Sequence, residues 1–209
     1  MSTPQQRVLE MMASGQVSKE EAEHLLSALE RPARKERWYL DPVGALSTSG
    51  AASLALAVTL LQLAAFALGV RFDGAMDVHV SGRSVSFATG LIDWVVSVPP
   101  MILIGYALAR SLKSEARLLD VALAVVSTRW LLILVGVLAL GIPTNVDPLN
   151  PVLLALAIGM LPVLALYFVN LFRSYRTATG LKGGRLWLAY FVTLLVPEVL
   201  SKLALVAIG

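Results

Sequence analysis

Five long apolar stretches limit this chain to few architectures. They run approximately over residues 45–70, 88–110, 119–141, 152–172 and 186–208. At ~1.5 Å per residue, each stretch is long enough as a helix to cross ~30 Å of hydrocarbon. The chain is 57% hydrophobic and only 15% charged, which is the composition of an integral membrane protein rather than of a soluble domain. The sequence therefore predicts an all-α, polytopic membrane bundle of five transmembrane helices.

Lysine and arginine are distributed unevenly between the connections, and this predicts the orientation. Thirteen lie in the N-terminal segment and in the second and fourth connections, whereas the first connection holds only Arg71 and Arg83 and the third holds none. Cytoplasmic segments of membrane proteins carry the excess of basic residues. We therefore expect a cytoplasmic N-terminus and an external C-terminus. The isoelectric point of about 9.4 follows from the same excess, so it does not indicate a nucleic-acid partner.

The polar N-terminal part predicts two segments before the membrane domain. Residues 1–30 predict a cytoplasmic helix pair, with Ser18 and Glu21 as a capping box at the start of the second helix. Residues 31–44 predict a basic juxtamembrane linker, and residues 45–209 the five-helix transmembrane domain. Two such short helices cannot bury much apolar surface alone. We therefore predict that the apolar stripe on the second helix binds a partner; it consists of Leu25, Leu26 and Leu29.

The first external connection has a pattern of its own. Val78 and Val80 alternate with polar residues, as do Val85 and Phe87, and Ser81-Gly82 stands between the two pairs. This pattern is typical of a β-hairpin with a two-residue turn. A lone hairpin is only marginally stable in water. We therefore expect this external β-hairpin loop to lean on the membrane surface, on other loops or on a partner.

Four ionisable residues lie within the apolar stretches: Asp93, Arg129, Glu198 and Lys202. A charge in lipid costs ~2.5–3.5 kcal/mol, so we expect these groups to pair or to face a wet cavity. Counting ~1.5 Å per residue places Arg129 at the depth of Glu198, and Asp93 at the depth of Lys202. We predict one polar cluster joining the second, third and fifth spans. Because its acids and bases balance, we favour a role in fixing helix packing over a proton relay or a substrate site.

Prolines lie inside three of the predicted spans, where each removes a backbone donor. They are Pro99 and Pro100 in the second span, Pro162 in the fourth and Pro197 in the fifth. We expect helix kinks that serve packing, which are commoner than broken helices around a transport site.

The motifs of catalysis are missing from the sequence. The chain has no cysteine and only two histidines, His24 and His79, which are too few for most zinc sites. It also lacks the patterns GxxxxGK[ST], HExxH and GxSxG. The sequence therefore predicts no metal, no cofactor and no enzymatic activity.

Two segments carry a family resemblance. In "DPVGAL", before the first stretch, Asp41 and Gly44 match a DLYGP-like motif, whereas Pro42 and Val43 depart from it. The segment "YFVNLFRSYRTATGLKGGRLWLAYFVTLLVPEVL" is similar to a final pair of helices joined by a basic, glycine-containing loop. With the five-span layout, residues 41–209 resemble the Yip1 family. The resemblance implies a non-enzymatic membrane protein; some bacterial relatives are associated with ABC exporters.

The N-terminal segment "RVLEMMASGQVSKEEAEHLLSAL" resembles short helical modules at the front of bacterial envelope-stress proteins. The matching residues are Leu9, Glu10, Met11, Gly15, Glu20, Glu21, Ala22, Leu25 and Leu26. This second resemblance implies a bacterial inner-membrane protein with a protein-binding role.

Two hypotheses for function follow from these observations. The first is a non-catalytic adaptor or accessory protein whose partners are the lipid bilayer and a membrane protein, for which an ABC exporter is one candidate. The alternative is a small transporter or channel in which the four intramembrane ionisable residues line a polar pathway. The sequence leaves a homo-oligomer open under either hypothesis, and it indicates no nucleic-acid partner.

Overall fold

The computed structural model describes residues 4–30, 37–81, 84–141 and 150–208. The chain divides into two compact units, Met1–Glu36 and Arg37–Gly209, which we describe separately.

The first unit is a pair of short helices. Helix α1 (Pro4–Ala13) and helix α2 (Lys19–Glu30) are joined by a turn that includes Gly15, whose φ of 71° favours glycine. At the start of α2 the Ser18 amide donates to Glu21 Oε2 at 3.0 Å, and the Glu21 amide donates to Ser18 Oγ at 3.2 Å. This reciprocal pair is a capping box, which satisfies two amides that the helix leaves free.

The second unit is helical, and five of its segments are long and apolar enough to cross a membrane. The all-α fold and the five apolar helices predicted from the sequence are therefore confirmed. A short helix, α3 (Pro42–Ala45), precedes them. The five segments are α4 (Thr48–Ala65) with the 3-10 turn η1 (Phe66–Leu68), α5 (Phe87–Ser111), α6 (Leu118–Thr128) with α7 (Trp130–Leu140), α8 (Pro151–Thr179) and α9 (Gly183–Ile208).

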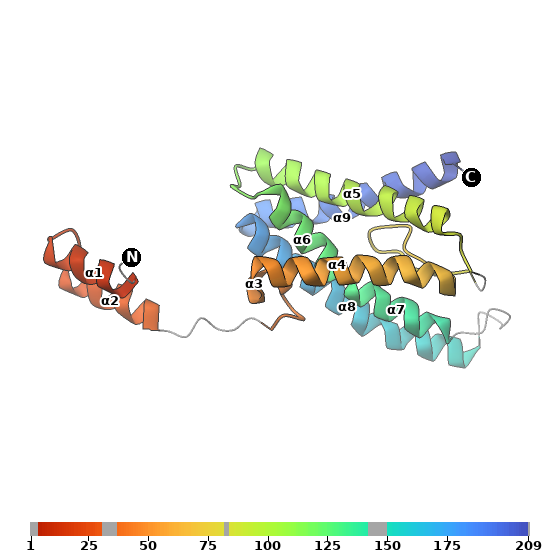
Figure 1. The fold of residues 1–209 in the computed structure, drawn as a ribbon, viewed down its shortest axis with the longest axis horizontal. Coiled ribbons are helices and arrows are strands. Elements are labelled where there is room, and N and C mark those ends of the chain that lie inside the picture. Colours follow the sequence, from red (N-terminus) through yellow and green to blue (C-terminus); the bar gives the residue numbers. More distant parts are fainter. Residues whose placement is uncertain (1–3, 31–36, 82–83, 142–149, 209) are drawn as a thin grey trace. The chain divides into compact units, whose positions relative to one another are not determined.

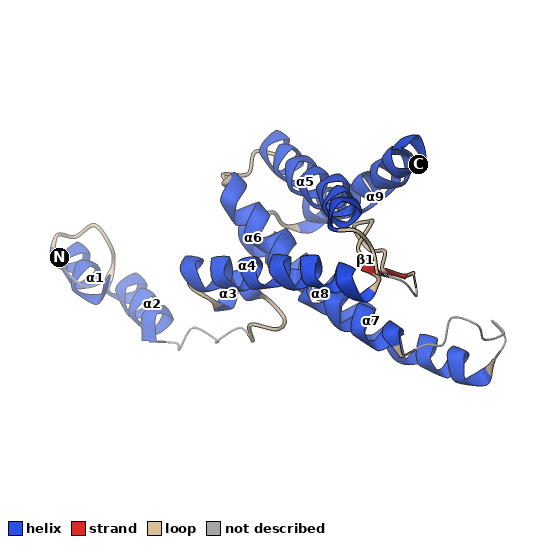
Figure 2. Cartoon of the chain, turned by 45° about the vertical axis from the view of Figure 1, so that its right-hand side comes forward, coloured by secondary structure: helices blue, strands red, loops and turns tan. Residues whose placement is uncertain are grey.

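The helices of the second unit form two groups. Helix α5 packs along α9, and α6 packs against α4, α5 and α8. Figures 1 and 2 show α5 and α9 on one side of the bundle and α4, α7 and α8 on the other, with α6 between them.

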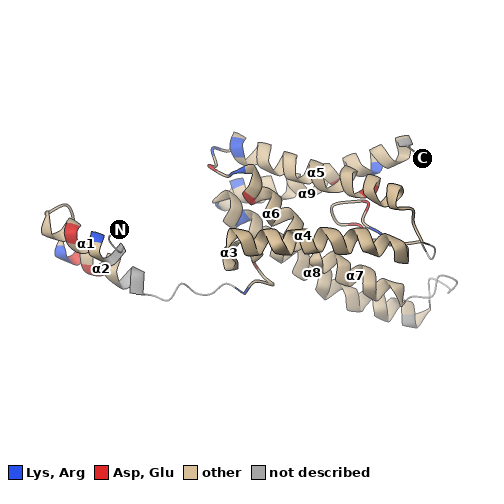
Figure 3. Ribbon diagram, in the orientation of Figure 1, with Lys and Arg blue, Asp and Glu red and all other residues tan. Residues whose placement is uncertain are grey.

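Most lysine and arginine residues of this bundle lie at one of its two ends (Figure 3). At one end, which we call the basic end, α5 and α8 end and α6 and α9 begin; these segments carry Arg110, Lys113, Arg117, Arg173, Arg176, Lys182 and Arg185. The opposite end carries the connection between α4 and α5, and we call it the loop end.

The third span is interrupted at Arg129, where no proline is present. Arg129 ends α6 and precedes α7, with ψ at −4° rather than at a helical value. The two residues before it turn their hydroxyls back onto α6: Ser127 donates to the Leu123 carbonyl at 2.6 Å, and Thr128 donates to the Ala124 carbonyl at 2.9 Å. Back-bonding of this kind bends helices. The prolines do not interrupt their spans in this way: α5, α8 and α9 each contain proline and continue past it.

The predicted strand pairing of the first connection is wrong. The strands are β1 (Val70–Arg71) and β2 (His79–Val80), which pair antiparallel with Val70 opposite Val80. Val85 is not in a strand, and Phe87 already begins α5; the Ser86 hydroxyl caps that helix by accepting from the Thr89 amide. A helix cap therefore overrides the alternation at residues 85–87. Gly82, in the predicted turn, lies outside the described residues.

Candidate functional site

The connection between α4 and α5 enters the bundle instead of covering its end. We call residues 70–80 the inserted loop. Val70, Phe72 and Ala75 are each at most 1% exposed, although they lie at or beyond the predicted end of a span. Figure 1 shows this loop between α5 and the α4–α7 pair. Non-helical backbone inside such a bundle leaves amides and carbonyls that need partners.

Arg129 supplies partners for the loop carbonyls. It is fully buried, and its Nη2 donates to the Gly74 carbonyl at 3.2 Å while Nη1 lies 3.5 Å from the Ala75 carbonyl. The Ala75 carbonyl also accepts from the Tyr167 hydroxyl of α8 at 2.8 Å. The break between α6 and α7 therefore lies at the residue whose long, positively charged side chain reaches the tip of the inserted loop. The two carbonyls supply hydrogen-bond acceptors for the Nη atoms of this buried guanidinium, whereas its Nε has no hydrogen-bond partner among the described residues.

Glu198 binds the same loop from α9. Its Oε2 accepts from the Met76 amide at 3.1 Å, and its carboxylate fills the space beside Gly74 that a Cβ atom would need. Glycine at position 74 thus permits the close approach of this carboxylate. Arg129 and Glu198 attract each other electrostatically, but they form no direct ion pair in the described part of the chain.

Lys202 lies one helical turn beyond Glu198 and joins α9 to the acidic side chains of the loop. Its Nζ is 2.6 Å from Asp77 Oδ2, 3.3 Å from Asp73 Oδ1 and 3.9 Å from Glu198 Oε1. Asp73 also contacts His79 Nδ1 at 3.0 Å. Burial tends to raise the pKa of Asp73, but the charges of His79 and Lys202 and their hydrogen bonds outweigh burial and hold this pKa below its ordinary value.

Asp93 pairs with the loop, not with Lys202. Its carboxylate is fully buried in α5 and accepts from Arg71 Nε and Nη2, both at 2.8 Å. This two-point geometry is the strong form of a guanidinium–carboxylate pair. The hydrogen bonds with Asp93 raise the pKa of Arg71 above its ordinary value. On the same helix, the Ser97 hydroxyl donates to the Phe72 carbonyl at 3.2 Å.

The structure thus brings all four predicted ionisable residues to one region but changes their partners. The predicted Asp93–Lys202 pair is replaced by Asp93–Arg71 and by Lys202 with Asp73 and Asp77. The depth count gives no loop partners, because it places the first connection outside the helices. Its sequence held a usable pattern, since charged residues alternate with Val70, Phe72, Val78 and Val80; they are Arg71, Asp73, Asp77 and His79.

A pocket of about 670 Å³ opens beside these charges at the loop end. Ligand atoms of Asp73, Asp77 and His79 lie within 4.8 Å of one another, close enough to hold a metal ion. The Lys202 ammonium contacts two of these three groups, Asp77 at 2.6 Å and Asp73 at 3.3 Å. Asp73 and Asp77 are therefore already engaged in ion pairs with Lys202.

The Asp41 of "DPVGAL" is a buried anchor at the start of the second unit. It caps α3 by accepting from the Gly44 amide at 2.9 Å, and it accepts from two hydroxyls of α8, those of Ser174 at 3.2 Å and Thr177 at 2.6 Å. Next to it, the Tyr39 carbonyl accepts from Asn170 at 2.7 Å. These bonds fix the segment before the first span against the fourth.

The predicted partner-binding leucines fall in the first unit. Leu25 is 40% exposed, and Leu26 is partly buried. The side chain of Leu29 lies outside the described residues. Leu9 of α1 is 46% exposed, so this small unit presents apolar side chains from both helices.

Comparison with protein families, with characterised proteins and with solved structures gives no match for this chain. The resemblance to the Yip1 family and the resemblance of the N-terminal helices stay predictions.

Proposed function

We propose that this chain is a non-catalytic accessory protein of a bacterial inner membrane, of the Yip1 type, which acts through protein contacts. Its basic end would face the cytoplasm together with its N-terminus. The observation that carries the proposal is how the ionisable residues within the spans are used. Asp93, Arg129, Glu198 and Lys202 all contact the inserted loop, so their contacts account for them as supports of the fold. No transported species is needed to explain them.

The exposed apolar residues of the first unit support a protein partner. A helix pair of this size gains little from its own core, and it keeps Leu9 and Leu25 exposed. We expect these residues to contact a membrane protein such as an ABC exporter subunit.

Affinity purification from native membranes in mild detergent tests the partner. The full chain, a chain lacking residues 1–30 and the variant Leu25→Glu are compared, with Glu23→Gln on the same helix as the matched control. We expect a membrane protein to co-purify with the full chain and the control but not with the other two. The same set of co-purified proteins from all four would contradict a role for the N-terminal unit.

Single cysteines test the orientation, because the chain has no native cysteine. Glu115 at the basic end and Ser84 at the loop end are both exposed. In intact spheroplasts, an impermeant thiol reagent should label Ser84→Cys and leave Glu115→Cys unlabelled until the membrane is opened. The reverse result would overturn the proposed topology.

A transporter is the second candidate, and the pocket at the loop end favours it. Charged side chains line that pocket and reach Asp93 and Lys202 inside the bundle. Reconstitution in liposomes with ion or proton gradients tests this candidate. Flux that Glu198→Gln abolishes would support it, and flux that this variant leaves unchanged would exclude the predicted pathway. Liposomes without flux would favour the accessory protein.

A further inference from the structure

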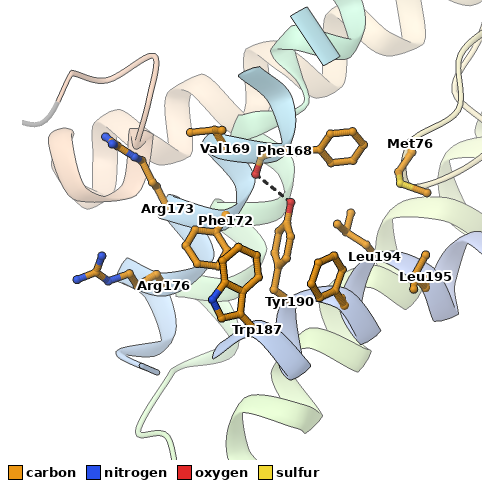
Figure 4. A pocket seen from close by; sticks show the side chains of 11 residues that line it. Met76, Phe168, Val169, Phe172, Arg173, Arg176, Trp187, Tyr190, Leu194 and Leu195 are labelled. Carbon is orange, nitrogen blue, oxygen red and sulfur yellow. Dashed lines mark hydrogen bonds between the residues drawn. The ribbon is translucent and has the colours of Figure 1, made fainter. Parts of the chain in front are cut away.

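A groove of about 610 Å³ runs between α8 and α9, and none of the residues in the inserted loop's ion pairs lines it. Figure 4 shows its aromatic lining and, at one end, two arginines of α8. Met76 at the tip of the inserted loop also lines the groove. The volume lies within the range of small-molecule pockets.

The wall of this groove is built from packed aromatic rings. Phe172 lies against Trp187 with ring centroids 4.4 Å apart, and it meets Tyr190 edge-on at 5.2 Å. Tyr190 is buried, and its hydroxyl donates to the Phe168 carbonyl at 2.9 Å. The one hydroxyl in the lining is thereby occupied, which leaves a surface suited to hydrocarbon.

The groove is exposed along this apolar surface. Trp187 and Phe191 are each 50% exposed, and Leu195 is 54% exposed. All three lie on α9, one of the helices long and apolar enough to cross a membrane. If the chain spans a membrane as proposed, acyl chains contact this face.

Two basic side chains stand at the mouth of the groove. Arg173 and Arg176 are exposed and lie one turn apart near the end of α8, and the described lining of the groove contains no acidic residue. They belong to the basic end, where lipid headgroups would lie under the proposed topology. Basic pockets between transmembrane helices on this side of a membrane are suited to anionic headgroups.

We propose that this groove binds one anionic phospholipid of the cytoplasmic leaflet. The phosphate and anionic headgroup would lie at Arg173 and Arg176, and an acyl chain would lie along Phe172, Trp187 and Leu194 toward Met76. This inference rests on the membrane location given under the proposed function. A second copy of the chain fits less well, because a two-fold axis along the membrane normal would bring the same arginines together at one depth.

Titration of the purified full chain in mild detergent tests the proposal. The probes are dioctanoyl-phosphatidylglycerol, dioctanoyl-phosphatidylcholine and inorganic phosphate, and the readout is the dissociation constant from native mass spectrometry and thermal shift. Each arginine near a headgroup contributes about fivefold in affinity. We therefore expect the anionic lipid to bind about 25-fold more tightly than the zwitterionic one.

Matched variants separate the site from general basicity. Arg176→Gln should lose about fivefold of this preference, and Arg173→Gln/Arg176→Gln should remove it, whereas Arg185→Gln, at the basic end but outside the groove, should stay within twofold of wild type. Trp187→Ala should weaken both lipids alike. Inorganic phosphate at equal concentration should give no shift.

Several results would overturn the proposal. They are equal affinity for the two lipids, an equal loss in Arg185→Gln and Arg176→Gln, or protection by phosphate alone. Self-crosslinking of Trp187→Cys at high yield would assign the groove to a second copy. Co-purification of a protein that Trp187→Ala releases would assign it to a partner helix. Failure of the chain to reconstitute into liposomes would instead contradict the membrane location itself.

Discussion

Replacement of Arg129 by methionine tests whether the side chain of this residue anchors the inserted loop to the helices. The variant Arg129→Met keeps most of the side-chain length but removes every donor. The Gly74 carbonyl then loses its partner at 3.2 Å, which costs about 1–3 kcal/mol for a buried group. Removal of one member of a buried charge network typically costs about 3–5 kcal/mol.

Two features place the expected loss near the lower limit of that range. Tyr167 still donates to the Ala75 carbonyl, and Lys202 stays 3.9 Å from Glu198. We expect a loss of about 3 kcal/mol, which corresponds to a fall of about 6–12 °C in the unfolding midpoint for a chain of this size. Thermal melts in mild detergent at one fixed scan rate measure it, with Arg185→Met at the exposed start of α9 as the control.

The double variant Arg129→Met/Glu198→Gln adds a stricter test. Because both residues hold the same loop, the double variant should lose less than the sum of the two single losses. A midpoint for Arg129→Met within about 1 °C of wild type would refute an anchoring role for this guanidinium. Strictly additive losses would show that Arg129 and Glu198 act independently.

Three further predictions concern the same bundle. Glu198→Leu should destabilise the protein by about 1–3 kcal/mol more than Glu198→Gln, since only the amide keeps an acceptor for the Met76 amide; equal melting points would contradict this bond. Gly90→Ala should destabilise the protein by about 1–3 kcal/mol, because the Phe66 ring occupies the position of the new methyl group. Gly159→Ala, with open space around it, should be neutral or stabilising by up to ~1 kcal/mol. Similar melting points for the two variants would refute the packing of Phe66 against Gly90. The pKa of Asp73 is lower in the folded chain than its ordinary value of 3.8, so the stability that the Asp73 carboxylate contributes is lost as the pH falls through the folded pKa. The difference in melting point between wild type and Asp73→Asn should therefore shrink as the pH falls below about 4, and a difference that grows from about pH 4 downward would contradict the sign.

The helical part of this fold was predictable because the apolar stretches are long and their limits are marked by charge. The predicted second span, 88–110, corresponds closely to α5 (Phe87–Ser111). The break at Arg129 does not follow from the prolines, which are the usual sequence signal of an interrupted helix. The pair Ser127-Thr128 beside a charged residue was the available signal, since both hydroxyls can bond back to helix carbonyls.

The inserted loop was missed for a different reason. The depth of a residue along a span can be counted from the sequence, and this count places Arg129 and Glu198 at the same depth. It cannot show that a connection folds back between the helices, because that depends on the space left by small residues such as Gly74 and Gly136. As a consequence, Asp93 and Lys202 have partners in the inserted loop that differ from the predicted ones.

Accessibility of single cysteines measures the burial of the inserted loop directly. Ala75 is fully buried at the loop tip, and Ser84 in the same connection is exposed. In the folded protein a small maleimide should react with Ala75→Cys many times more slowly than with Ser84→Cys, and the two rates should become equal after unfolding in strong detergent. Equal rates in the folded protein would show that the loop lies outside the bundle and that the buried charges have another purpose.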